Sequence, residues 1–437
     1  MDAIKHLQDA IRLATVSHAD PYETDWTPFR EFVDFMAEAY PLIHEKMEVK
    51  LINDFALIYR WPGTSSEAKP ILLTAHYDVV AASDEDWEHP PFSGHDDGDK
   101  IWGRGTLDDK SSLVAIMEAA TSLLEAEYVP PYDIYFSFGF DEEVGGTLGA
   151  SGIARYFQEE DISFRYVLDE GGAVTEGKSL GVDAELAMIG IAEKGNNSFR
   201  FLFRGEEGHS STPPTSTAVG KMAAFIHDVE NNPLPLRMTS TLEATLKALA
   251  PYKAGVEGFI LSRPSFFAPL ISRILVKNRQ TSAMLRSSIA FTMTEAGSGH
   301  NILPRTATCV ANIRVLQGDT VDGVLDHLKG LGHEYEIVDE ILVNEATSVS
   351  DVEGEGMTYT KEIIGKVYPA AVAMPYLMVG GTDSRYYDKV ADNAYRFLPL
   401  KLSSAELDTM HGRGEHISHE NYFKMIEFYT EFLLNLE

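Results

Sequence analysis

Three short apolar runs, each followed at once by acidic or imidazole side chains, limit what this chain can fold into. The runs occupy residues 71–75, 134–140 and 166–168, and the side chains that follow them are His76 and Asp78, Glu142 and Glu143, and Asp169 and Glu170. A short apolar run of this kind is typical of a strand that is buried inside a sheet. Because ligands of open α/β sheets bind beyond the carboxyl ends of the strands, we expect these side chains to converge.

Helical patterns alternate with these predicted strands. Apolar side chains recur at three- and four-residue spacing over 110–128, and a second helix is predicted over 149–158. After about residue 193 the pattern changes to strands at 197–203, 289–295 and 307–316 with helices at 217–231 and 320–330. We therefore predict an α/β fold: a mixed-sheet domain with helices on both faces, formed by residues 1–192 and 346–437, and interrupted by a smaller α+β domain at 193–345.

Composition excludes several classes of partner. The chain has 437 residues, with 67 acidic and 36 basic side chains and a net charge of -31, which argues against nucleic acid and against an anionic membrane surface. The basic residues between 273 and 286 are interpreted as a solvated helix face. The one cysteine, Cys309, excludes an intrachain disulfide and fits a reducing, cytoplasmic location, although a cysteine-poor secreted protein would look the same. No uncharged apolar stretch is long enough to predict a membrane span.

A Gly-rich turn at 102–107 adds Asp108 and Asp109 at a predicted helix start, and His411 precedes the last predicted helix. Imidazoles with several carboxylates suit Zn²⁺, with Co²⁺ or Mn²⁺ as alternatives. The surplus of carboxylates predicts two divalent ions, one shared ligand, and one further carboxylate that takes a proton from water. Each piece also has a structural interpretation, since Asp-Asp often caps a helix and Glu-Glu often lies on a solvated face.

These motifs together resemble the M20 family of metallopeptidases, the aminoacylase and carboxypeptidase clan. The matching strings are His76-Tyr-Asp78-Val-Val, Trp102-Gly-Arg-Gly-Thr-Leu-Asp108-Asp109-Lys110, Asp141-Glu142-Glu143-Val-Gly-Gly, Leu168-Asp169-Glu170-Gly, Gly208-His209-Ser-Ser, Asn301-Ile-Leu-Pro and Gly381-Thr-Asp383-Ser-Arg385. The chain looks most similar to the branch that holds carboxypeptidase S and the N-acyl amino acid hydrolases. The resemblance gives the inserted domain the role of a lid or dimerisation domain, with a homodimer as one possible assembly.

The resemblance implies a role for each matching residue. The metal ligands are His76, the bridging Asp108, Glu143, Asp169 and His411, with Glu170 as the alternative to Asp169 and with His416 and His419 competing with His411. Glu142 is the general base, and Asp78 orients His76. The peptide bond after Asp108 is expected to be cis. His209 is expected to stabilise the oxyanion, in its own site or in a partner's.

Substrate recognition is assigned to Asn301, Arg314 and Arg385, which resemble positions that bind a free carboxylate. The expected enzyme uses water activated by two metal ions to cleave the amide of a short peptide or N-acyl amino acid. The alternatives are a deacylase or desuccinylase of a biosynthetic intermediate and a non-catalytic binding protein on the same fold. Structural interpretations also remain: Arg314 as a surface strand residue, and Arg385 in a structural salt bridge.

Overall fold

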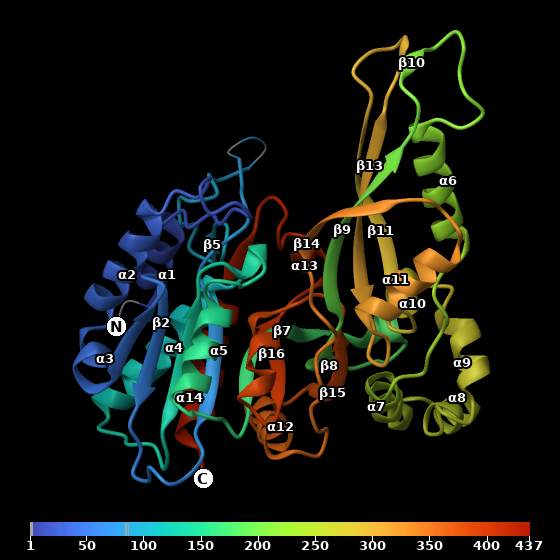
Figure 1. The fold of residues 1–437 in the computed structure, drawn as a ribbon. Coiled ribbons are helices and arrows are strands. Elements are labelled where there is room, and N and C mark those ends of the chain that lie inside the picture. The colour runs from blue at the N-terminus through green and yellow to red at the C-terminus, as the bar shows by residue number, and fades with distance from the viewer. Residues whose placement is uncertain (1–2, 84, 86) are drawn as a thin grey trace. The chain divides into compact units, whose positions relative to one another are not determined.

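The structure is a computed structural model that describes residues 3–83, 85 and 87–437 (Figure 1). It divides into two compact units. The first comprises residues 1–191, 349–376 and 382–437, and the second comprises residues 192–348 and 377–381. The boundaries between the units lie after residue 191 and before residue 349, and the domain boundaries expected from the sequence, after residue 192 and before residue 346, stay predictions. The short return of 377–381 to the second unit was not predicted.

The first unit is built on an eight-stranded mixed sheet with the order β1-β2-β6-β3-β7-β16-β8-β15. The strands are β1 (Glu48–Ile52), β2 (Ala56–Trp61), β3 (Ile71–His76), β6 (Ile134–Gly139), β7 (Val167–Glu176), β8 (Glu185–Glu193), β15 (Ala371–Met378) and β16 (Ala394–Lys401). Strands β6, β3, β7 and β16 run parallel, whereas β1 and β2 are antiparallel to their neighbours. The carboxyl ends of β6, β3 and β7 therefore lie at the same end of the sheet, which we call the sheet edge.

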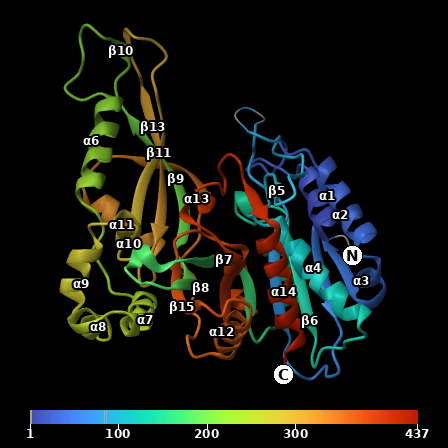
Figure 2. The ribbon, with the colours of Figure 1, turned by 180° about the vertical axis from the view of Figure 1, so that it is seen from behind.

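Helices cover both faces of this sheet, which confirms the predicted fold class. Helix α5 (Ala150–Glu159) lies on one face, and α4 (Lys110–Glu125) and α14 (His419–Leu434) lie on the other (Figures 1 and 2). Every residue of β3 and β6 is buried as a result. The remaining helices of this unit are α1 (Ala3–Arg12), α2 (Thr27–Ala39), α3 (Pro41–Lys46), α12 (Glu355–Val367) and α13 (Ser404–Leu407).

The second unit contains an antiparallel sheet with the order β11-β13-β9-β14. Its strands are β9 (Gly195–Arg204), β11 (Ser288–Ala296), β13 (Thr306–Val315) and β14 (Glu336–Leu342), and helices α6 (Ala218–Asn231) and α11 (Val321–Gly330) share a core with them. Alternate residues of β9 (Phe199, Phe201 and Phe203) point into this core. A smaller core lies among α7 (Ser240–Leu249), α8 (Gly255–Leu261), α9 (Ala268–Leu275) and α10 (Arg279–Ala283).

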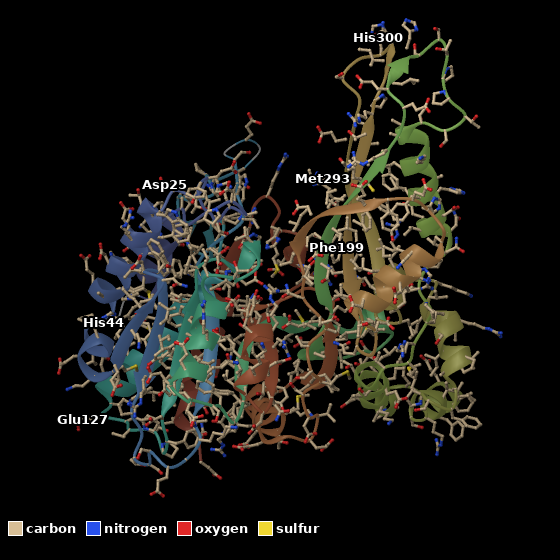
Figure 3. The ribbon with its side chains drawn as sticks, in the orientation of Figure 1. Asp25, His44, Glu127, Phe199, Met293 and His300 are labelled. Atoms are coloured by element: carbon tan, nitrogen blue, oxygen red, sulfur yellow. The ribbon has the colours of Figure 1, made fainter. Side chains whose placement is uncertain are left out.

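The short elements β10 (Gly208–His209) and β12 (Ile302–Leu303) pair with each other. They lie at the tip of this unit, where Figure 1 labels β10 and Figure 3 labels His300, two residues before β12. In the first unit, β4 (His95–Asp96), β5 (Lys100–Trp102) and β17 (His416–Ser418) form a small separate sheet. Among the residues that the structure describes, no helix is long and apolar enough to cross a membrane.

Candidate active site

The predicted convergence at the sheet edge is present in the first unit. His76 is the last residue of β3, and Glu142 and Glu143 begin the 3₁₀ turn η1 (Glu142–Val144) just after β6. Asp108 lies in the loop before α4, and the peptide bond that joins it to Asp109 is cis, as the sequence resemblance implied. His411 reaches the same place from the loop between α13 and β17.

Asp108 is the centre of this cluster because each of its carboxylate oxygens faces a different imidazole. His76 Nε2 lies 2.9 Å from Asp108 Oδ1, and His411 Nε2 lies 2.9 Å from Asp108 Oδ2. His411 Nε2 is also 3.1 Å from Glu143 Oε2. A carboxylate placed between two imidazoles in this way is suited to bridge two cations.

Two groups of side chains could each hold one ion. The first consists of His76, Asp108 and Glu170, and the second consists of Asp108, Glu143 and His411, with the ligand atoms of each group within 4.8 Å of one another. Asp108 belongs to both groups, as expected for the shared ligand. The two groups contain His76, Asp108, Glu143 and His411 from the predicted set, together with Glu170, the predicted alternative to Asp169.

The predicted ligand outside both groups is Asp169, which was preferred over Glu170. Asp169 Oδ2 accepts a hydrogen bond from the backbone N–H of Ser384, at 2.7 Å, and Asp169 Oδ1 accepts one from the N–H of Glu170. Both residues belong to β7, and successive side chains of a strand point to opposite faces. Glu170 therefore faces the cluster. Asp169 instead helps to hold the segment that contains Ser384, the 3₁₀ turn η4 (Asp383–Lys389), which we call the 380s loop.

The donor set fits two divalent cations. Glu143 Oε1 is buried and has no hydrogen-bond partner in the described part of the chain. Burial, followed by the charge of Asp108, raises the pKa of both Glu143 and Glu170. Burial and the neighbouring carboxylate both disfavour the charged form of these carboxyl groups, and cations bound to their oxygens would favour it.

Asp78 ties three parts of the site together. Its carboxylate oxygens accept hydrogen bonds from the backbone N–H groups of Glu142 and Glu143, at 3.0 and 3.2 Å, and from Ser17 Oγ at 2.7 Å. His76 Nδ1 lies 3.1 Å from the Asp78 carbonyl oxygen and 3.3 Å from Asp78 Oδ1. These contacts fix the imidazole with Nε2 towards Asp108, which is the orienting arrangement expected around a histidine ligand. The contribution of Ser17 was not predicted.

Glu142 differs from Glu143 in its surroundings. It belongs to neither candidate metal group and is nearly buried, and burial raises its pKa to about 8. The nearby positive charge of Arg385, whose Nη2 lies 3.7 Å from Glu142 Oε1, acts in the opposite direction. A carboxyl group held beside the metal ligands, with a pKa near neutrality, is suited to accept and return a proton.

A buried ion pair joins the two loops that carry Asp108 and His411. Glu415 Oε2 accepts a hydrogen bond from Arg104 Nη1 at 2.5 Å, and Arg104 Nη2 donates to the carbonyl of Gly412. Glu415 Oε1 accepts from the backbone N–H groups of Gly105, Leu107 and Asp108. This Arg104–Glu415 pair was not predicted, although both residues stand inside the motifs that were recognised.

The competing histidines lie elsewhere. The His416 ring packs on Trp102 with 4.4 Å between ring centroids, and its Nε2 is 3.1 Å from Lys100 Nζ. His419 Nε2 is 3.0 Å from Asp96 Oδ1. His416 and Trp102 belong to the small β4–β5–β17 sheet, and His419, at the start of α14, contacts β4 of the same sheet. Of the three histidines, only His411 belongs to a candidate metal group of the described residues.

The remaining predicted residues belong to the second unit. His209 lies on β10, opposite Ile302 of β12, and the carbonyl of Asn301 accepts a hydrogen bond from the N–H of Ser210. His209 is exposed, and its Nδ1 lies 2.8 Å from Ser211 Oγ. Arg314 lies on β13, and its Nε donates to Asn312 Oδ1 at 3.0 Å. Their roles in oxyanion stabilisation and substrate binding remain predictions.

Comparison with known proteins gives the chain its family. The model of "Peptidase family M20/M25/M40" matches residues 72–435, which is most of the chain. The chain belongs to this family. The predicted membership and the prediction of a hydrolytic enzyme are thereby confirmed, and the non-catalytic alternative loses its support.

Individual relatives and a solved structure agree with this family assignment. The chain is 34% identical to carboxypeptidase S-like 2 of Dictyostelium discoideum, over 100% of this chain and 85% of the relative. It is 31% identical to the N-fatty-acyl-amino acid synthase/hydrolase of Homo sapiens, over 99% of this chain and 87% of the relative. An M20 family metallo-carboxypeptidase from Sulfolobus solfataricus shares the fold, with a TM-score of 0.75, 17% identity, and coverage of 99% of this chain and 98% of that chain.

The choice between the two adjacent acids of β7 leads to a prediction. We expect Glu170→Gln to remove about one metal ion per chain, because Glu170 lies in one candidate group only. Asp169→Asn, the matched control, should retain both ions and instead lower the unfolding temperature, since its carboxylate bonds the backbone of the 380s loop. Elemental analysis and thermal unfolding of the two variants measure this, and loss of an ion from Asp169→Asn alone would reverse the assignment.

Proposed function

We propose that this member of the family is a two-metal hydrolase that cleaves the amide bond of N-acyl amino acids or short peptides with a free C-terminal carboxylate. The observation that carries the proposal is Asp108, whose two oxygens face His76 and His411 while Glu142 lies beside them as an additional carboxyl group. The names of two relatives, a carboxypeptidase S-like protein and an N-fatty-acyl-amino acid hydrolase, support this substrate class.

Two divalent cations, for which we propose Zn²⁺, would be held by His76, Asp108 and Glu170 and by Asp108, Glu143 and His411. When bound, such cations polarise a carbonyl group and lower the pKa of water between them. The mixture of imidazole and carboxylate donors supports Zn²⁺, with Co²⁺ or Mn²⁺ as the alternatives.

Glu142 is the proposed general base and general acid. One of its carboxylate oxygens accepts a proton from the attacking water, and the same group then donates that proton to the leaving nitrogen. Asp78 positions the backbone of Glu142 through the hydrogen bond from its N–H, so the base is held at a fixed place relative to His76. Arg385, next to Glu142, is proposed to bind the substrate carboxylate, because a planar guanidinium matches a carboxylate in two hydrogen bonds.

Residues of the second unit complete the proposal. We assign oxyanion stabilisation to His209 and further substrate contacts to Asn301 and Arg314. A cytoplasmic location and a homodimer formed through the second unit also belong to the proposal, and neither affects the hydrolytic step described above.

A panel of substrates tests the proposed function. N-acetyl and long-chain N-acyl amino acids, dipeptides, and the same compounds with the carboxylate amidated are incubated with protein loaded with Zn²⁺, Co²⁺ or Mn²⁺, and the released amine is measured. We expect hydrolysis of the free acids and a loss of about tenfold or more on amidation, because the site then forfeits a charged hydrogen-bond partner. Equal turnover of acids and amides, or no turnover of either, would contradict the proposal.

Metal-free protein should lose stability as the pH rises. Burial raises the pKa of Glu142 from 4.5 to about 8, and hydrogen bonds to Asp108 and Glu143 raise the pKa of His411 from 6.5 to about 10. Each group binds its proton more tightly in the folded chain, so its stabilising effect is full below the unfolded pKa and is lost as the pH rises through the folded pKa. The unfolding temperature of chelated protein should therefore fall between about pH 5 and about pH 10.

The matched variant for this pH experiment is Glu142→Gln, which removes one titrating group. Its unfolding temperature after chelation should depend less steeply on pH than that of the unmodified protein. Added Zn²⁺ should also flatten the dependence, since cations replace the protons that the cluster otherwise needs. An unfolding temperature of chelated protein that is constant or rises over this range would refute the assigned pKa directions.

A further inference from the structure

Six large apolar side chains stand exposed within one short stretch of the second unit, and we call them the 252–274 patch. They are Tyr252, Val256, Phe259, Phe266, Leu270 and Ile274. Phe266 is 79% exposed and Val256 is 74% exposed, which is far more than an incompletely covered core residue would be. The stretch covers α8 and α9, and these helices lie at the end of the unit remote from β10 (Figure 1). No catalytic or metal-binding residue proposed above belongs to it.

Helix α9 shows that the patch is additional to what folding requires. Phe267, Ile271 and Leu275, at four-residue spacing, pack on the small core around Leu242 and Leu246. The adjacent residues 266, 270 and 274 repeat the same spacing and form a second apolar stripe, which is exposed. One buried stripe is sufficient to attach a surface helix to its domain, so the second stripe is available to contact something else.

Charge around the patch is opposite to that of the whole protein. Residues 247–286 contain seven basic side chains and one acidic side chain, Glu257, in a chain whose net charge is -31. Arg273 of α9 follows the exposed Leu270 by three positions and so lies beside the stripe. Lys277 lies in the turn that follows α9, where its backbone N–H donates to the carbonyl of the exposed Ile274 at 3.3 Å.

Most of these cations have no acidic partner among the residues that the structure describes. Lys247 pairs with Glu243 at 3.6 Å, and Lys253 pairs with Glu257 at 3.0 Å. In contrast, Arg263, Arg273, Lys277 and Arg279 are exposed, and none forms an ion pair with an acidic residue that the structure describes. The guanidinium carbon of Arg263 lies 4.3 Å from the centre of the Phe259 ring, which places a cation directly within the apolar surface.

We propose that the 252–274 patch, with its border of arginine and lysine residues, docks on the surface of an anionic phospholipid bilayer. Helices with exposed aromatic and aliphatic side chains flanked by Arg and Lys lie in the membrane interface, with the apolar groups at the acyl boundary and the cations at the lipid phosphates. A symmetric contact between two copies of the chain through this patch would instead bring the unpaired cations of both copies together, where they repel.

The net charge alone predicts repulsion from such a membrane, and the local arrangement reverses this expectation. At physiological ionic strength, exposed charges are screened beyond about 8 Å, so acidic groups distant from the contact act weakly on the lipid surface. The basic residues interpreted from the sequence as a solvated helix face are, on this proposal, the headgroup contacts.

Vesicle flotation with the full chain tests the proposal. The protein is mixed with vesicles of phosphatidylglycerol and phosphatidylcholine or of phosphatidylcholine alone, and the floated fraction is measured at increasing salt. We expect binding to the anionic vesicles only, and binding that weakens with salt. The triple variant Phe259→Ser, Phe266→Ser, Ile274→Ser should lose about tenfold or more of its partitioning. The variant Arg273→Gln, Lys277→Gln, Arg279→Gln should lose a similar amount.

A matched control substitutes three exposed apolar residues of the same unit, Met293→Ser, Val338→Ser and Ile341→Ser, whose side chains are 59%, 48% and 46% exposed. It should float like the unmodified protein, and all variants should unfold at temperatures close to that of the unmodified protein. Failure of the unmodified protein to bind anionic vesicles, or unchanged binding by the Phe259 triple variant, would overturn the proposal. So would a concentration-dependent dimer that the triple variant abolishes, with no flotation of either protein.

Discussion

Glu142→Ala lowers kcat by about 10²–10⁴-fold and leaves two metal ions bound. The reason is that Glu142 belongs to neither candidate metal group, yet lies next to Glu143, which does, and holds a carboxyl group whose pKa burial raises to about 8. Removing the base therefore leaves the ligands in place and takes away the group that accepts and returns the proton. Steady-state kinetics together with metal analysis measure both parts of this expectation.

The neighbouring carboxylate is the matched control for that experiment. Glu143→Ala should lower the metal content by about one ion per chain, because Glu143 Oε2 lies in the group with Asp108 and His411. The two variants would thus have different effects: the loss of Glu142 lowers turnover while metal is retained, and the loss of Glu143 lowers the metal content. Normal kcat in Glu142→Ala, or loss of metal from it, would assign the proton transfer to another group.

Asp108→Ala should remove both ions and with them nearly all turnover. Asp108 is the only residue shared by the two candidate groups in the described chain, and each of its oxygens faces one imidazole. The variant also lacks the carboxylate that lies between the imidazoles of His76 and His411. Metal content and activity are the measurements, and His411→Ala, which lies in one group only, is the comparison that should retain one ion.

The outcome that contradicts this prediction is specific. If Asp108→Ala binds two ions per chain, then the two groups do not share a ligand, and His76 and Glu170 hold their ion independently of Glu143 and His411. If the variant instead fails to fold, Asp108→Asn gives the same comparison, since it keeps the shape of the side chain and removes its charge.

Much of the scaffold could be predicted because it follows from apolar patterning. The runs at 71–75 and 134–140 are strands β3 and β6, and their polar successors meet because parallel strands end at a common edge. Strand β16 (Ala394–Lys401) was not predicted, because no recognised motif follows it in the sequence. It nevertheless lies inside the sheet, beside β7. The apolar pattern alone therefore predicted where the strand ends with the candidate ligands meet, but it did not predict every strand of the sheet.

The choice between Asp169 and Glu170 shows what pattern cannot supply. On a strand, two adjacent acids point to opposite faces, and a sequence does not say which face looks at the cluster. That information comes only from the packing of β7 between β3 and β16, where Asp169 meets the backbone of Ser384. The Arg104–Glu415 pair was unpredictable for a related reason, because the two residues are 311 positions apart and meet only in the folded unit.

The Arg104–Glu415 pair also bears on how the enzyme is made. The loop that carries Asp108 is held by a carboxylate that leaves the ribosome more than 300 residues later, and His411 leaves only shortly before it. Domains fold during synthesis as their residues emerge, so a partly synthesised chain can form most of the sheet and still lack His411, one of the five proposed metal ligands. On the proposed function, hydrolytic activity would then begin only after His411 has emerged, so the metal site is completed later than the strands that carry its other ligands.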